Sequence, residues 1–323
     1  MITRLARLFA VPDYARPGHP AARRDRAGER RPDFAARLLR ALAHFVIAVA
    51  VLLMGVLVAS GFLTQPFGDR PSEAVYNILI VPTLLLSASL SLGAYINGIS
   101  ILSILRGGAA WDMLRTTPGG VRLTLLARHS ATLARGGRLL IALTGVRVLL
   151  IVLLLWDMIA NQGRTLELLI LGITPTIGVA VAVPLLAAGM AASLLLPVTG
   201  ALLDTAIGLV VASITRSRFG IILVTAAIVA VRVPLVIFLG LQRLFLLSDV
   251  PTLDAGEQWR IVVGASVVDQ GYGLLHLLDG AAIWALVPYG ILLGGIMLAI
   301  AVGQAWLADR LVLWAADRAQ KRG

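Results

Sequence analysis

Long runs of apolar residues alternate with short polar and basic segments along most of this chain. Clear runs cover residues 41–63, 75–105, 139–159, 219–245 and 281–306. Each is about 20 residues or longer, which is the length that an α-helix needs to cross the roughly 30 Å core of a bilayer. Strand-length alternation is absent, and lipid permits only helices or closed barrels as spanning structures. The pattern therefore predicts an all-α, polytopic transmembrane helical bundle.

The run from residue 166 to 214 does not resolve into single spans. It is nearly free of charge, exceeds the length of one span, and contains Pro175, Pro184 and Pro197. The second run is likewise interrupted, by Pro82. The 166–214 run could make two spans, so that hydropathy suggests three segments between Arg138 and Arg216, whereas two basic segments that both lie inside require an even number of crossings. We therefore predict about six spans and one extra apolar element that is broken, re-entrant or lies on the membrane surface. The sequence leaves open which segment this is.

Composition agrees with a membrane protein. Hydrophobic residues make up 59% of the chain and charged residues 14%, against roughly 25% charge in a soluble domain. The net charge is +11. The arginines lie in short blocks beside the apolar runs rather than in a basic stripe interleaved with aromatic residues. They therefore indicate orientation in the membrane, and we expect no nucleic-acid partner.

The charge distribution predicts which segments face the cytoplasm. Residues 1–40 contain ten arginines against four acidic residues, and residues 106–138 contain six arginines against one. Both are expected inside, the first as a basic tail that ends in a surface helix. The external segment, 246–280, has five acidic residues and one arginine, and its two short apolar pieces would form short helices. The membrane domain is then 41–306, followed by a cytoplasmic tail, 307–323.

The basic turn around Arg216 is also expected inside. An even number of crossings must then separate it from Arg138. Both chain termini are predicted to be cytoplasmic.

Residue types that enzymes and metal sites need are scarce. The chain has no cysteine, and its four histidines are not paired at ligand spacing, so we expect no metal site. The only lysine, Lys321, lies in the C-terminal tail, whereas a Walker A loop needs a lysine directly after its glycines. We expect no catalytic residue, no cofactor and no enzyme activity.

The most distinctive polar segment is WDMLRTTPGGVRLTLLARHS, residues 111–130. Trp111 and Leu114, three apart, would share one face of a short helix, and Asp112 would pair with Arg115. The TTPGG sequence then breaks the helix and turns the chain. A plain positive-inside loop is the simpler interpretation, but it does not require a folded helix–turn–helix.

A second helix is predicted after this turn. Leu123 and Leu126 would lie on its apolar side, and Arg128 and Arg135 on the other. We expect this helix to return along the lipid headgroups.

The segment resembles the cytoplasmic coupling helix of the membrane subunits of type 2 ABC exporters, which lies between their second and third spans. Trp111 takes the family's hydrophobic place and Asp112 its acid. Thr117 and Pro118 take its Thr-Pro pair, and Arg128 stands at its later basic position. The chain departs from the family in having two alanines where a Gly-Thr pair is usual. The turn at residues 212–221 and the polar insertion before the last span also resemble that family.

The resemblance implies a permease subunit in the plasma (bacterial inner) membrane, surrounded by lipid and energised by a separate ATPase subunit that binds ATP. Trp111 and Leu114 would be apolar anchors in a cleft of that ATPase, with Asp112 and Arg115 as polar contacts. A second copy of the chain or a related permease would complete the transporter. The resemblance does not identify the substrate.

Three charged residues fall inside predicted spans: Arg147, Asp204 and Arg232. Such charges are costly unless they are paired or hydrated. One arginine could pair with Asp204, and the set could form a gate or a substrate contact. We favour the simpler interpretation, in which the arginines brace the bundle or extend toward the interface.

Two other classes of protein stay open. An ion-coupled secondary transporter would use Asp204 as a titrating acid, although no internal repeat supports that class. A non-transporting scaffold subunit would need none of these charges.

Overall fold

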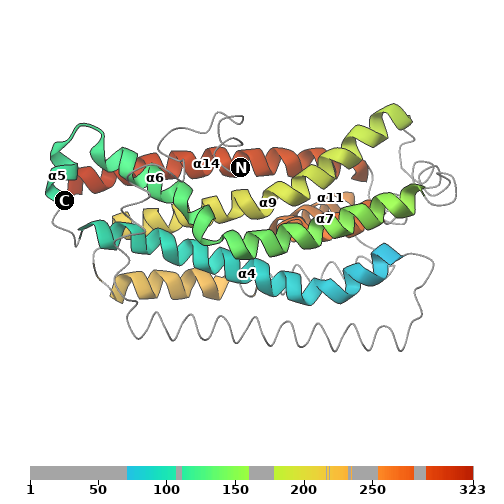
Figure 1. Cartoon of the computed structure of the whole chain (residues 1–323), viewed down its shortest axis with the longest axis horizontal. Coiled ribbons are helices and arrows are strands. Elements are labelled where there is room, and N and C mark those ends of the chain that lie inside the picture. The colour runs from blue at the N-terminus through green and yellow to red at the C-terminus, as the bar shows by residue number, and fades with distance from the viewer. Residues whose placement is uncertain are drawn as a thin grey trace.

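The structure is a computed structural model that describes residues 71–106, 111–159, 178–215, 217, 219–231, 234, 254–279 and 289–322. These residues form helices and connecting turns, with no strand among them (Figure 1). The helices are α4 (Pro71–Arg106), α5 (Trp111–Thr116), α6 (Gly120–Arg135), α7 (Gly137–Ile159), α9 (Val179–Ile214), α11 (Ala255–Val268), α12 (Tyr272–Asp279), η3 (Gly290–Leu292) and α14 (Leu293–Arg322), with a further helix at Phe219–Val231.

Four of the described helices, α4, α7, α9 and α14, are long and apolar enough to cross a membrane. They lie roughly along one direction, as expected for a bundle of membrane helices (Figure 1). The prediction of an all-α membrane protein is therefore confirmed. The first predicted span, the second half of the 219–245 run with Arg232, and residues 281–288 lie outside the described residues.

Prolines do not break the long helices. α4 is continuous through Pro82, and α9 is one 36-residue helix that contains both Pro184 and Pro197. At about 1.5 Å per residue α9 is about 54 Å long, more than one bilayer thickness. The described part of the 166–214 run is thus a single long helix rather than two spans. Neighbouring helices allow such prolines because they shield or re-pair the freed carbonyl groups.

Glycines bring the long helices into close contact. A Cβ on Gly98 of α4 would lie 2.2 Å from the carbonyl oxygen of Thr205, and a Cβ on Gly208 would lie 2.2 Å from that of Tyr95. At the α9–α14 contact, a Cβ on Gly294 would lie 2.4 Å from the Leu185 oxygen. Membrane helices pack through such small residues because lipid gives no hydrophobic drive for association.

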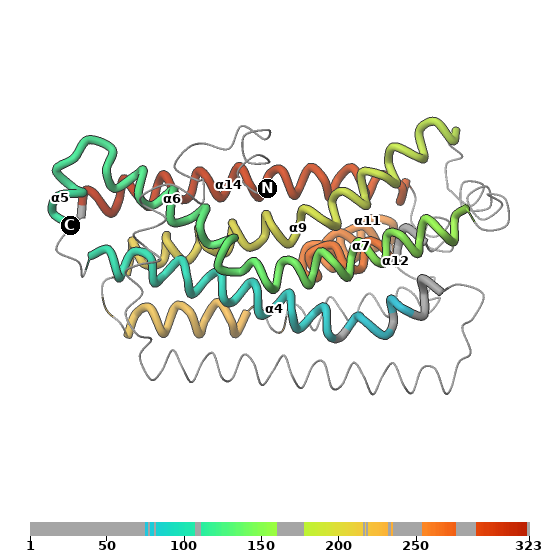
Figure 2. Tube along the Cα trace, viewed as in Figure 1, coloured from blue at the N-terminus to red at the C-terminus, as the bar shows by residue number. Residues whose placement is uncertain are grey.

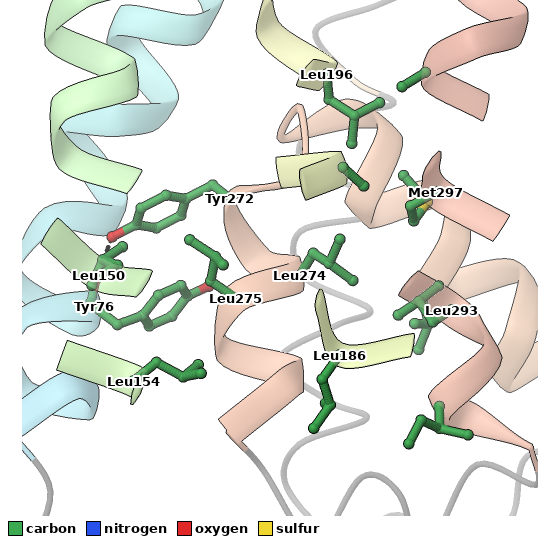
Figure 3. Packing of buried hydrophobic residues seen from close by; sticks show 14 of the residues in the cluster. Tyr76, Leu150, Leu154, Leu186, Leu196, Tyr272, Leu274, Leu275, Leu293 and Met297 are labelled. Atoms are coloured by element: carbon green, nitrogen blue, oxygen red, sulfur yellow. Dashed lines mark hydrogen bonds between the residues drawn. The ribbon is translucent and has the colours of Figure 1, made fainter. Parts of the chain in front are cut away.

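The apolar core forms two large clusters at opposite ends of the bundle. One gathers α11, α12 and the first half of α14 around Tyr272, Leu186 and Met297 (Figure 3). The other gathers α5, the start of α6, and the C-terminal halves of α4, α9 and α14. Figure 1 accordingly shows α5 beside the C-terminus, at the end of the molecule away from α11.

The two short apolar pieces predicted in the 246–280 segment are confirmed as helices, α11 and α12 (Figure 2). The last long helix differs from its prediction. α14 does not stop near Trp306 but continues to Arg322, because Ala308, Val312 and Ala315 are buried against the bundle and extend its apolar face into the predicted tail.

Candidate functional site

The segment singled out in the sequence folds as a helix–turn–helix. We call residues 111–119, which comprise α5 and the turn after it, the knob. Gly119 has φ of +70°, a left-handed conformation that favours glycine. A Cβ on Gly120 would lie 2.6 Å from the Leu114 oxygen, so the turn needs glycine there too. The Thr117 Oγ1 donates to the Met113 oxygen at 2.7 Å and closes α5. The predicted break at TTPGG is confirmed.

Trp111 fixes the knob to the rest of the chain. Its side chain is only 8% exposed and lies in the apolar cluster with Leu102 of α4 and Val312 of α14, and Leu114 packs partly buried against the same cluster. This corrects the expectation that Trp111 and Leu114 point outward as anchors for a partner. They face inward because the large indole finds its apolar contacts within the bundle.

The outward face of the knob is small and mixed. Asp112, Thr117 and Pro118 are exposed, as is Met113 at 73%. Arg115 is half-buried, and its Nε makes no hydrogen bond within the described residues. The surface left for a partner is therefore one acid and one large apolar side chain beside the Thr-Pro turn.

α6 is packed into the bundle, against α14 and α9. Its buried residues are Val121, Leu125, His129 and Thr132, whereas Leu123 is 55% exposed. The prediction for the apolar side was therefore wrong, because Leu123 is exposed and Leu126 is only partly buried. The reason is that this helix buries polar His129 and Thr132 against α9 instead of laying an apolar face on lipid. Arg128 is half-buried and Arg135 is exposed.

His129 is 4% exposed, and its Nε2 lies 2.9 Å from the Leu202 oxygen of α9. A neutral imidazole with its proton on Nε2 donates this bond. Burial lowers the pKa of His129 below its ordinary value of 6.5, although the Leu202 bond and the charge of Asp309 oppose the shift. The neutral form thus joins α6 to α9 at physiological pH.

Arg147 of α7 is fully buried. Its Nη1 donates to the backbone carbonyl oxygen of Ser193 in α9 at 2.8 Å. Its Nη2 lies 3.5 Å from the backbone carbonyl oxygen of Asp269, in the turn between α11 and α12. Pairing with Asp204 is excluded by position, since Asp204 and Ser193 are eleven residues, or about 16 Å, apart on α9. Arg147 therefore links α7, α9 and the α11–α12 turn.

The turn that Arg147 reaches is itself closely held. The Asp269 carboxylate accepts hydrogen bonds from the backbone of Gly271 at 2.9 Å and Gly273 at 2.8 Å, which begins α12. Gly271 has φ of +80° and lies against Ser193, so no larger residue fits. The Tyr272 hydroxyl donates to the backbone carbonyl oxygen of Tyr76 at 2.9 Å, and the two rings stack (Figure 3).

Asp204 of α9 is only 6% exposed. Its carboxylate accepts a hydrogen bond from the Ser91 hydroxyl of α4. Ser87, one turn before Ser91, and Thr83, one turn earlier, are also buried on α4. Asp204 is thus the acid of a polar strip in the α4–α9 contact.

Sequence reasoning missed Asp269, Tyr272 and His129 as buried polar contacts. An available signal was the Asp-Gln-Gly-Tyr sequence between two short apolar pieces, since an acid followed by glycine favours a tight, hydrogen-bonded turn. His129 gave none, because one histidine in a basic segment does not indicate burial.

Among the described residues, no group of three or more His, Cys, Asp or Glu side chains could hold a metal ion. A scan of known protein families, a search of curated proteins and a search of solved structures each gave no match.

Proposed function

We propose that the chain is the permease subunit of an ATP-driven ABC transporter of the type 2 export class. It would cross the plasma membrane about six times, with both termini in the cytoplasm, and export a substrate with energy from a separate ATPase. A second copy or a related permease would complete the pathway. The lack of a Walker A lysine is consistent with ATP being hydrolysed in another subunit.

The observation that carries the proposal is the knob. A passive loop needs neither a buried tryptophan nor a glycine turn, whereas an element that transmits force between subunits must be rigid and joined to the helices it moves. Trp111 gives that connection to α4 and α14. With Trp111 turned inward, the proposed ATPase contact consists of Asp112, Met113, Thr117 and Pro118, flanked by Leu123. This revises which side chains would touch the partner, not where it docks.

Charge reversal in the knob tests the proposal. The chain, purified in mild detergent from its native membrane, should carry a stoichiometric subunit with ATPase activity, and Asp112→Arg should release it. Glu257→Arg, an exposed acid in the first turn of α11, is the matched control and should retain the subunit. If no ATPase accompanies the wild-type chain, or if both variants retain it equally, the proposal fails.

The burial of Asp204 against Ser91 favours one second candidate, an ion-coupled transporter in which this acid takes up a proton. That class predicts transport that survives ATP depletion, collapses with the proton gradient, and is abolished by Asp204→Asn. An ABC permease predicts the reverse dependence on ATP. A scaffold subunit predicts that neither condition matters.

A further inference from the structure

A partly open groove lies at the elbow where α6 turns into α7, against α4. Its volume is about 150 Å³. Figure 2 shows α6 bending directly into α7 alongside α4. The elbow is tight because Gly136 lies against Leu90, and a Cβ there would be 3.1 Å from the Leu90 Cδ1. The proposed function makes no use of this groove.

The lining of the groove is mostly apolar, and its polar residues are Ser89, Asn97, Thr132 and Arg135. Leu90, Leu133, Leu139 and Leu140 supply the apolar wall, and Arg135 supplies a cation. An apolar cavity of about 150 Å³ holds a benzene-sized group, so the groove takes a short stretch of hydrocarbon rather than a whole acyl chain. Arg135 is exposed, so its guanidinium is accessible.

The depth of the groove in a bilayer follows from α7. This helix has 23 residues, or about 35 Å at 1.5 Å per residue, and it begins at Gly137. A helix of this length that crosses the bilayer has its first turn at the level of the headgroups. Arg135, just before that turn, would then be at phosphate depth, while Leu139 and Leu140 would lead into the hydrocarbon.

We propose that this groove binds one anionic phospholipid of the surrounding membrane. The phosphate would be held by the Arg135 guanidinium, whose planar fork matches a phosphate bidentately. Asn97, which also lines the groove, would supply an amide donor. The start of one acyl chain would lie on Leu90, Leu133 and Leu140. This inference depends on the chain's membrane location and not on its being a transporter.

The test uses the full-length chain in zwitterionic detergent, with phosphatidylglycerol or phosphatidylcholine added and bound lipid counted by native mass spectrometry. Phosphatidylglycerol should be retained preferentially by the wild type. Arg135→Gln should reduce its retention about tenfold or more, as expected for losing a charge-assisted hydrogen bond. Gly93→Leu should do the same by filling the groove, since a Cβ on Gly93 meets nothing within 4 Å.

Arg138→Gln is the control, because Arg138 is exposed on the same elbow but does not line the groove. It should leave retention unchanged, and inorganic phosphate should not displace the lipid. Equal losses in Arg135→Gln and Arg138→Gln would mean general charge attraction and would overturn the site. So would equal retention of the two lipids, displacement by inorganic phosphate, or normal retention in a folded Gly93→Leu variant.

Discussion

Arg147 illustrates how one buried charge can determine the arrangement of several helices. Its guanidinium is out of contact with water and donates hydrogen bonds to the backbone carbonyl oxygens of Ser193 and Asp269 instead. The negative charge of Asp269 lies close by. A buried cation without hydrogen bonds or a nearby negative charge would destabilise the bundle. Here the same residue links α7, α9 and the α11–α12 turn.

Replacement of Arg147 by leucine is predicted to lower the free energy of unfolding by about 3–5 kcal/mol, because it leaves the buried carbonyl oxygens of Ser193 and Asp269 without their donor. Arg147→Lys should lower the free energy of unfolding by less, since a lysine keeps the charge but loses the planar guanidinium that donates to two acceptors. Unfolding of the purified protein in detergent measures both. The exposed Arg138→Leu should change stability by no more than about 0.5 kcal/mol, and a similar loss there would refute the specific role of Arg147.

His129 makes stability depend on pH. Its pKa in the folded protein lies below the unfolded value of about 6.5, so the unfolded chain binds more protons as the pH falls. Stability contributed by neutral His129 is present above pH 6.5 and is lost as the pH falls below that value. The melting temperature should therefore drop between pH 7 and pH 5, and less steeply in His129→Gln, whose amide can still donate to Leu202. Identical slopes in the two proteins would contradict this.

At the scale of elements, the contact of α4 with α9 depends on glycine. Gly98→Ala places a Cβ 2.2 Å from a backbone oxygen, so the two helices must separate. We expect the free energy of unfolding to fall by about 1–3 kcal/mol, as for other overpacked sites. Gly93→Ala, on the same helix with open space around it, should be neutral or slightly stabilising. Equal melting temperatures for these two alanine variants would argue against close packing here.

The helices were predictable from the sequence because apolar length alone determines what can span a bilayer. The helix–turn–helix at residues 111–130 was also predictable, since TTPGG leaves few alternatives. Which side of a helix faces the protein was not. Leu123 is exposed while His129 is buried, because burial on α6 follows shape and the hydrogen bond to Leu202 of α9 rather than apolar character. Proline likewise misled the prediction for α9.

In the whole molecule, the two apolar clusters hold together different sets of elements at opposite ends of the bundle. The end with α11 and α12 is fixed by Arg147, Asp269 and Tyr272, and the opposite end joins the knob to the C-terminal half of α14. Movement of the knob would reach the far cluster through α4, α9 and α14, which contribute to both. The proposed transport cycle requires this mechanical continuity.

In the proposed transporter the knob lies in the cytoplasm and is covered by an ATPase. The chain contains no cysteine, so Met113→Cys provides a single labelling site on the exposed face of the knob. A membrane-impermeant maleimide should label it in inside-out vesicles stripped of peripheral proteins, and not in intact spheroplasts. Labelling should be suppressed when the ATPase subunit is retained. Labelling from the outside, or an equal rate with and without the ATPase, would contradict an ATPase-bound cytoplasmic knob.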